Sequence, residues 1–411
     1  RKVPEEVLSF YDMFSKSVEE EYTHVNTAFV PTVVETIKRD LSPKLYEITP
    51  AICDEVDSAI KQYLPSHDDW TEINTSKSML DIVSKASSHL FAGSDVSNNA
   101  DYLECTRDYI VHLFEAIKEI KGTRPWLRPL LCPRLSKVKR LVVTVTRLKS
   151  HVKRVIEKRD QASRTDPNWN PPEDMMQWLI NRSESQTDYL EGCAAAQIIL
   201  ILGIINPVML TLVSILHTLA VTPEYVEPLR EEIRNNLPND GSISAQDLKG
   251  FWKLDSYLKE TGQVYHPVIE PYFRSVRKGF TLSNGQFLPP SATVVVPNPS
   301  IITPGDQIFD GFRYSKLREA KPQEDQPNHR WLIANETEFR WGVGNHVCPG
   351  RFYAHHVIKI TLIRLISNYD IRMPGEAQIG LHNRYPTIEF GSSVLPAVDK
   401  PLMVRKVKAR S

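Results

Sequence analysis

The chain has 411 residues, and its 50 Lys plus Arg residues balance its 50 Asp plus Glu residues, so the formal net charge at pH 7 is zero. This balance gives no overall field to attract nucleic acid, and we expect no nucleic-acid partner. The five cysteines lack the paired spacing of a zinc site or a disulfide framework, which favours a reducing compartment. The length allows one large enzyme domain or two to three smaller domains.

The first part of the chain predicts helices. It begins with Arg1 and has no initiator Met and no apolar signal segment at its start, so we expect a chain that is soluble by itself and lacks part of the natural product. Apolar residues at helical spacing predict two or three helices within residues 5–65 and further helices over 79–91, 102–120 and 134–159. The last of these is basic, but apolar residues line another side of it, which favours a solvated helix face.

An almost unbroken apolar run extends from Cys193 to Val221 and is long enough to span a bilayer. Polar residues such as Gln197 and His217 interrupt it, and a charged helix over 224–236 follows directly. A core helix buried on all sides is equally hydrophobic, and we favour that interpretation over a membrane span.

The C-terminal part predicts one more helix and several short strands. The helix covers 248–264, and Asn284-Gly285 predicts a hairpin turn between segments that begin at Thr281 and end near Val296. A second small strand set is predicted near 387–390 and 402–405. The fold class is therefore mainly α with small β-sheets.

The stretch from Phe339 to Ala354 has the composition of a haem-thiolate loop. Gly342 and Gly344 can adopt positive φ angles, so the chain can curl closely past a flat porphyrin. A helix predicted over 351–367 would place Cys348 near a positive helix N-terminus, which stabilises a thiolate. The alternative is that Cys348 is a buried, unreactive thiol.

This stretch resembles the haem-binding signature of the cytochrome P450 family, and its His-x-Cys-Pro-Gly-Arg-Phe-Tyr-Ala portion is similar to filamentous-fungal members. The resemblance implies haem b with Cys348 as the axial iron ligand, His346 at a haem-propionate contact and Phe339 as an aromatic ring near the sulfur, with Gly342 in the loop. It extends in order over essentially all 411 residues. It therefore implies a single cytochrome P450 haem domain over 1–411, without the usual N-terminal anchor and first β region.

The resemblance also suggests further propionate contacts. Lys38 or Arg39 would reach a propionate from a helix at one haem edge, and the alternative is a surface charge pair. Arg274 falls at a position where the family often has a propionate-binding arginine, and the alternative is an exposed strand charge.

Family members also carry a Glu-x-x-Arg pair on one helix and a later arginine that lock the core beside the haem. Glu260 matches the glutamate, but Gln263 stands at the arginine position. Arg313 matches the later arginine and could form a charge-assisted pair with Glu260. The alternative is that Glu260 is an ordinary exposed glutamate.

The apolar helix departs from the family on the distal side of the haem. Monooxygenases of the family carry an acidic or polar residue followed by threonine, where this chain has Ile205 and Asn206. Isoleucine cannot relay a proton, whereas Asn206 can hydrogen-bond. Pro207 removes a helix hydrogen bond, and Gly203 permits close approach to the haem.

The resemblance implies a monooxygenase-type oxidoreductase that acts on an apolar small molecule, a fungal secondary metabolite such as a terpenoid, alkaloid or polyketide. It implies electrons from NADPH through cytochrome P450 reductase. It also implies the cytoplasmic face of the endoplasmic reticulum membrane if the natural chain has an anchor. The alternatives are a redox-neutral rearrangement catalyst, a degenerate haem protein without turnover, and a membrane-embedded interaction protein.

Overall fold

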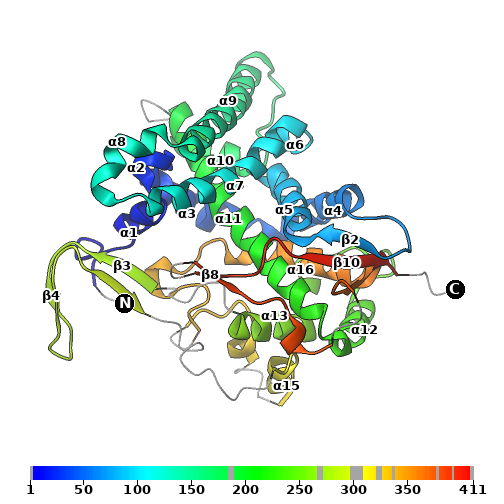
Figure 1. The fold of residues 1–411 in the computed structure, drawn as a ribbon. Helices are drawn as coiled ribbons and strands as arrows, with labels where there is room; N and C mark the ends of the chain where they lie inside the picture. The colour runs from blue at the N-terminus through cyan, green and yellow to red at the C-terminus, as the bar shows by residue number, and fades with distance from the viewer. Residues whose placement is uncertain are drawn as a thin grey trace.

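Helices form most of the structure, a computed structural model that describes residues 3–183, 189–265, 272–296, 309–320, 326–335, 338–375, 379–390 and 393–407 (Figure 1). The described α-helices are α1 (Phe10–Ser17), α2 (Glu20–Thr23), α3 (Val30–Thr36), α4 (Leu45–Tyr63), α5 (Thr75–Ala92), α6 (Ser94–Ser97), α7 (Ala100–Gly122), α8 (Arg128–Leu131), α9 (Ser136–Thr165), α10 (Met175–Ser183), α11 (Tyr189–Leu219), α12 (Val226–Asn236), α13 (Trp252–Val264), α15 (Arg313–Ala320) and α16 (Arg351–Asn368).

Helix α11 is the centre of the core. It crosses the molecule between an upper group, which includes α5, α7, α9 and α10, and a lower group, which includes α12, α13 and α15 (Figure 1). Among the described residues, it is the one helix long and apolar enough to cross a membrane, and 78% of its most apolar window is buried inside the structure. The position of α11 between the two groups of helices and its burial support the interpretation of the apolar run as a core helix.

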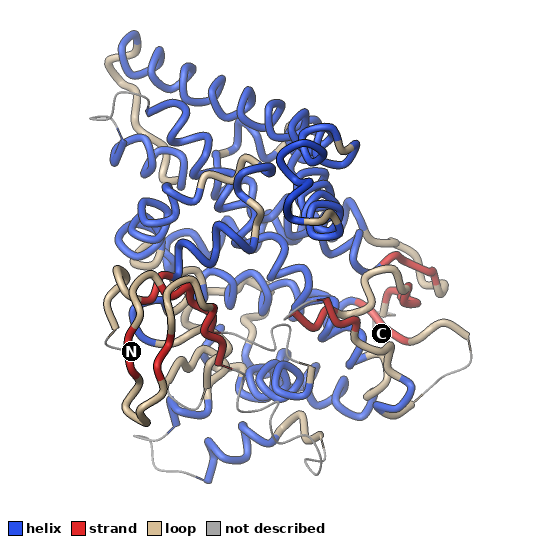
Figure 2. Tube along the Cα trace, turned by 60° about the vertical axis from the view of Figure 1, so that its left-hand side comes forward, coloured by secondary structure: helices blue, strands red, loops and turns tan. Residues whose placement is uncertain are grey.

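The strands form small sheets on two sides of the helices (Figure 2). One sheet has the order β1-β3-β6, and a second has the order β2-β10-β7; β4 pairs with β5, and β8 pairs with β9, all antiparallel. The bounds are β1 (Leu8–Ser9), β2 (Thr71–Asn74), β3 (Tyr272–Val276), β4 (Phe280–Thr281), β5 (Phe287–Leu288), β6 (Thr293–Val296), β7 (Tyr369–Arg372), β8 (Ile388–Phe390), β9 (Ser393–Leu395) and β10 (Pro401–Lys406).

The structure confirms a mainly helical fold with small sheets, but it corrects two strand pairings. Strand β6 pairs with β3 rather than with the hairpin, and the hairpin closes around Gly285 at φ 87°. The predicted strands near 387–390 and 402–405 do not share a sheet, because β8 pairs with the adjacent β9 while β10 lies between β2 and β7. The spacing of apolar residues identifies a strand but does not identify its partner.

Local hydrogen bonds define the start of α5 and the end of α3. The Asn74 side chain caps α5 by accepting from the Lys77 N–H at 2.9 Å, as expected for an N-terminal asparagine. Helix α3 continues as a single π-helical turn over Ile37–Leu41, in which the Ser42 N–H donates to the Ile37 carbonyl at 2.9 Å. Such turns are frequent at functional sites, and this one carries Lys38 and Arg39.

Candidate functional site

The Cys348 loop is tightly folded. Gly342 and Gly344 have φ angles of 75° and 70°, and a Cβ atom on Gly342 would lie 3.0 Å from the His346 carbonyl oxygen. The Cys348 N–H donates to the Trp341 carbonyl at 2.7 Å and closes the loop across these glycines. The two positive φ angles explain why glycine is needed at both positions.

The Cys348 sulfur lies at the start of α16. Desolvation raises the pKa of the Cys348 thiol, while hydrogen bonds from the backbone N–H groups of Gly350 and Arg351 and the charge of Arg351 act in the opposite direction. Cys348 is partly exposed, whereas the other four cysteines are buried. A sulfur that accepts amide hydrogen bonds at a helix N-terminus suits a thiolate ligand of a metal cation, and these residues therefore fit a haem iron.

Two basic side chains, Arg274 and Lys38, approach the loop from other elements and lie near His346 of the loop itself. Burial lowers the pKa of His346, and the positive charges of Arg274 and Lys38 lower it further, partly opposed by Glu5. The His346 ring and the buried Arg274 guanidinium lie 5.1 Å and 5.2 Å from the Phe10 ring centroid. This grouping gathers positive charge beside the cysteine loop, as two haem carboxylates would require.

The structure separates the two candidate cations of the π-helical turn. Lys38 lines a pocket of about 660 Å³ beside the loop, together with Gly344, Val347 and Arg351. Arg39 instead pairs with Glu35 at 3.2 Å, and its side chain is 69% exposed. Arg39 therefore forms the surface charge pair that was the alternative for this segment.

Glu260 and Arg313 meet in an ion pair. The Glu260 carboxylate is buried and accepts from the Arg313 Nη2 at 3.1 Å, from its Nε at 3.1 Å and from the Asp310 N–H at 3.0 Å. Gln263, at the unusual position, donates to Glu338 at 2.9 Å and accepts from the Tyr314 hydroxyl. The carboxylate of Glu260 is thus compensated without an arginine at position 263.

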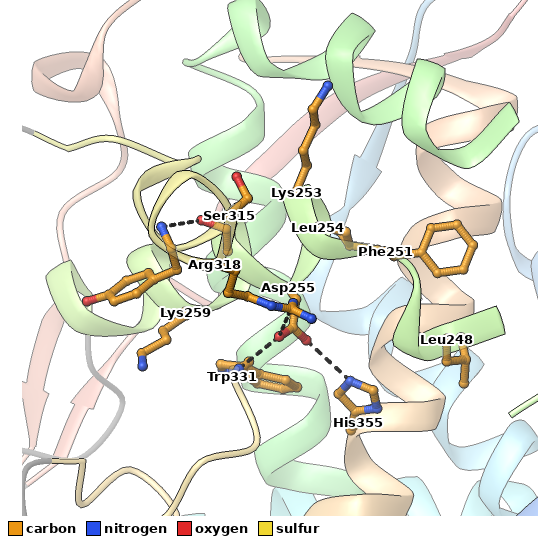
Figure 3. Close-up of polar contacts among 12 residues, drawn as sticks. Leu248, Phe251, Lys253, Leu254, Asp255, Lys259, Ser315, Arg318, Trp331 and His355 are labelled. Carbon is orange, nitrogen blue, oxygen red and sulfur yellow. Dashed lines mark hydrogen bonds and ion pairs between the residues drawn. The ribbon is translucent and has the colours of Figure 1, made fainter. Parts of the chain in front are cut away.

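A second buried charge cluster lies beside this pair and was not predicted from the sequence (Figure 3). Asp255 accepts from the Trp331 N–H at 2.9 Å, from Lys359 at 3.3 Å and from His355 at 3.4 Å, and Arg318 lies 3.8 Å away. Burial opposes ionisation, but Lys359 and His355 outweigh it and lower the pKa of Asp255. The sequence signal was a single lysine, Lys359, inside the apolar face of α16.

Two of the distal candidates, Gly203 and Asn206, lie on the side of α11 that is not fully buried, which we call its exposed stripe. Gly203 is exposed, and a Cβ atom on it would meet nothing within 4 Å, whereas Ile205 is fully buried. Asn206 lines a largely apolar cavity of about 500 Å³ between α5, α7, α11 and the segment that contains Leu395 and Val398. Asn206 therefore faces this cavity, while the pocket beside the cysteine loop is lined by other residues.

The aromatic residue that the structure ties to Cys348 is Trp341. Its carbonyl accepts from the Cys348 N–H, and its indole N–H donates to the Trp331 carbonyl at 2.9 Å. Phe339 is partly buried, and its carbonyl accepts from the Gly342 N–H at 2.7 Å. Trp341 stands three residues before Gly344 and seven before Cys348, a spacing that could have identified it from the sequence.

Comparison with known proteins decides the family. A family model described as cytochrome P450 matches residues 28–388. The chain belongs to the cytochrome P450 family. It is 60% identical over 409 residues to the cytochrome P450 monooxygenase TES1 of Alternaria alternata, covering 100% of this chain and 77% of that protein. It is 28% identical over 385 residues to the ent-kaurene oxidase P450-4 of Gibberella fujikuroi, covering 91% of this chain and 74% of that protein.

A solved structure shares the fold of this P450. The retinoic acid bound cyanobacterial CYP120A1 aligns with a TM-score of 0.68 and 18% sequence identity, covering 91% of this chain and 78% of that chain. Together with the fungal relatives, the family match identifies the chain as a cytochrome P450 monooxygenase of the fungal secondary-metabolism type. Membership of the family implies a haem cofactor and a small-molecule substrate.

Proposed function

We propose that Cys348 is the thiolate ligand of a haem b iron and that this P450 oxidises an apolar small molecule of fungal secondary metabolism. The observation that carries the proposal is the Cys348 sulfur, which accepts backbone hydrogen bonds at the N-terminus of α16 beside a group of basic side chains. When bound, the haem would supply the oxygen chemistry, and the thiolate would favour cleavage of the O–O bond.

The basic side chains are proposed to hold the haem propionates. Arg274, Lys38 and His346 come from three separate elements, and the charges of Arg274 and Lys38 both act on His346. Arg274 and Lys38 would pair with carboxylates as cations, and His346, whose pKa is lowered, would donate one hydrogen bond in its neutral form. Gly342 and Gly344 would let the loop pass close to the flat ring.

The substrate is proposed to lie along the exposed stripe of α11. The cavity that contains Asn206 is lined mainly by apolar side chains, including Leu80, Ile110, Phe114 and Leu210, which favours a hydrophobic ligand. Ent-kaurene, which appears in the name of one relative, is a hydrocarbon, and this supports a terpenoid-like skeleton. Asn206 would supply a hydrogen bond that orients a polar group of the substrate in this cavity.

Electron supply and location follow from the same proposal. Electrons would come from NADPH through cytochrome P450 reductase, and, if the natural chain has an anchor, that anchor would hold the enzyme on the cytoplasmic face of the endoplasmic reticulum membrane. A test is whether purified protein turns over with NADPH only when the reductase is added. Turnover with NADPH alone would contradict this part of the proposal.

A redox-neutral reaction is the second candidate, and α11 supports it. The segment from Cys193 to Leu219 contains no Asp, Glu, Lys or Arg, and Ile205 is fully buried. A site without a proton relay would suit the rearrangement of an organic peroxide, which is redox-neutral. An oxidation at the same site would instead need a substrate hydroxyl to deliver the proton. Peroxide turnover without reductase would favour this candidate, and strict dependence on NADPH and reductase would exclude it.

The central experiment is a spectrum of the reduced protein with carbon monoxide. A strongly red-shifted main band requires cysteine ligation, and its absence from a folded, haem-loaded sample would overturn the proposal. Replacement of Asn206 by Thr then tests the distal side. If Asn206 takes part in oxygen activation, the ratio of product formed to oxygen consumed changes; an unchanged ratio means that Asn206 is not a relay.

A further inference from the structure

Helix α13 contacts the cysteine loop at Gly262, which lies against Arg340 of the loop. The Arg340 guanidinium lies against this glycine, because a Cβ atom on Gly262 would stand 2.7 Å from Arg340 Nη1. The Arg340 side chain is only 9% exposed and donates to the Lys259 carbonyl at 3.0 Å and to the Leu258 carbonyl at 3.5 Å. A side chain at position 262 would occupy the space that the guanidinium fills.

The residue before Phe339 is attached to the same helix. Glu338 accepts from Gln263 at 2.9 Å and pairs with Lys259 at 3.4 Å, and its other oxygen lies 4.0 Å from Arg340. Two charged side chains of the loop, one on each side of Phe339, are therefore bound to the last turns of α13. Directional contacts of this kind fix both the position and the rotation of a segment.

The contacts of Glu338 and Arg340 with α13 are linked to Cys348 through one residue, Trp341. Trp341 directly follows Arg340, and its carbonyl accepts the 2.7 Å hydrogen bond from the Cys348 N–H. Its indole N–H is held by the Trp331 carbonyl at 2.9 Å. A shift of Arg340 would therefore move the carbonyl that orients the backbone of the cysteine.

We propose that Arg340 is a positioning residue for Cys348, and that its guanidinium takes the place of the arginine that α13 lacks at position 263. Gln263, Gly262 and Arg340 form one compensating set. Gln263 places a neutral amide, and not a second guanidinium, beside Glu338. Gly262 leaves an open space because it has no side chain, and the Arg340 guanidinium fills that space. Burial lowers the pKa of Arg340, but Glu338 opposes this effect and arginine stays charged at neutral pH.

Reciprocal rescue tests this inference, which rests on the proposed ligation by Cys348. Arg340→Met removes the donors while keeping an unbranched apolar side chain, and we expect the cysteine-ligated fraction of the reduced carbon monoxide complex to fall about threefold or more. Gln263→Arg alone is expected to lower this fraction as well, because a second guanidinium would face Arg340. The double variant Gln263→Arg/Arg340→Met is expected to recover most of the wild-type fraction.

A milder pair of variants covers the case in which Arg340→Met does not fold. Gly262→Ala keeps every charge, but its added Cβ atom would clash with the Arg340 guanidinium and displace it. We therefore expect this variant to lower the cysteine-ligated fraction. Gly122→Ala is the matched control, since Gly122 ends α7 and has nothing within 4 Å of the added Cβ atom. Arg159→Met, which breaks the buried pair between α9 and Asp174 and changes no residue of the loop or of α13, controls for general loss of stability.

The outcomes are distinguishable. A wild-type spectrum without cysteine ligation overturns the proposed function itself. A wild-type spectrum with cysteine ligation that is retained in both Arg340→Met and Gly262→Ala overturns only the positioning role of Arg340. A double variant as poor as the worse single variant also overturns it, because the two positions would then not be interchangeable.

Discussion

The two sides of the candidate haem site are built from different interactions. On the loop side, formed by α13, α16 and residues 338–350, the buried charged groups Asp255, Glu260 and Lys359 and the partly buried Arg340 are joined by ion pairs and hydrogen bonds. On the α11 side, the segment from Cys193 to Leu219 has no Asp, Glu, Lys or Arg and is nearly all buried. Directional bonds fix a ligand atom in place, whereas apolar packing defines only a volume.

The largest expected effect is on the loop side. Cys348→Ser should abolish the red-shifted carbon monoxide band and substrate oxidation, because a serine hydroxyl does not replace the thiolate. Absorbance spectroscopy of the haem-loaded variant measures this. Cys132→Ser, which changes a buried cysteine in another part of the chain, should keep the band. A red-shifted band that persists in Cys348→Ser would remove the distinction between the two sides.

The next effect is on the buried charges of the loop side. Asp255→Asn leaves Lys359 and Arg318 buried without their counter-ion, and we expect the free energy of unfolding to fall by about 3–5 kcal/mol. Urea unfolding with unchanged m-value measures this change. Asp160→Asn is the control, because its exposed pair with Arg164 should contribute less than about 1 kcal/mol. Equal losses in the two variants would mean that burial of the cluster is unimportant.

The α11 side has a titratable group of its own, His217. Burial and the charge of Arg384 lower the pKa of His217 to about 3, and both ring nitrogens lack a hydrogen-bond partner among the described residues. The unfolded chain binds a proton near pH 6.5 that the folded chain binds only near pH 3, so this group lowers stability as pH falls below 6.5. At pH 5 the loss should reach about 2 kcal/mol.

His217→Phe keeps a ring against Tyr385, which lies 5.1 Å away, and removes the titration. The difference in unfolding free energy between pH 7 and pH 5 should therefore shrink by about 2 kcal/mol relative to wild type. Denaturant unfolding at the two pH values measures it. An unchanged profile in His217→Phe would show that the His217 ring does not contribute to the acid sensitivity of the fold.

The smallest expected effect is on the rate of haem loss, and it distinguishes Lys38 from the neighbouring Arg39. Lys38→Met should speed haem loss to a scavenging globin by about fivefold, because it removes one cation beside the propionates. Arg39→Met should change the rate by less than about twofold, because Arg39 pairs with Glu35 at the surface. Equal rates for the two variants would leave Lys38 without a role in holding the haem.

Sequence patterns identified most helices because each carries a long apolar stripe. The apolar run became α11, and the segment after Cys348 became α16, both within a few residues of prediction. The loop itself was predictable, because its glycines and its cysteine are local in the chain. Pairing was less predictable: β10 joins β2 across more than 300 residues, and no local pattern specifies such a partner.

The sequence alone determined the tight glycine and cysteine loop, for which we propose a haem-thiolate role, and the long apolar helix, because both depend on residues that are close together in the chain. Only the tertiary structure decided that Arg340 fills the space above Gly262, that Lys38 rather than Arg39 faces the loop pocket, and that Asp255 is surrounded by cations. These are contacts between distant segments. Their existence depends on how helices pack, and packing is set by the whole core rather than by any one stretch of residues.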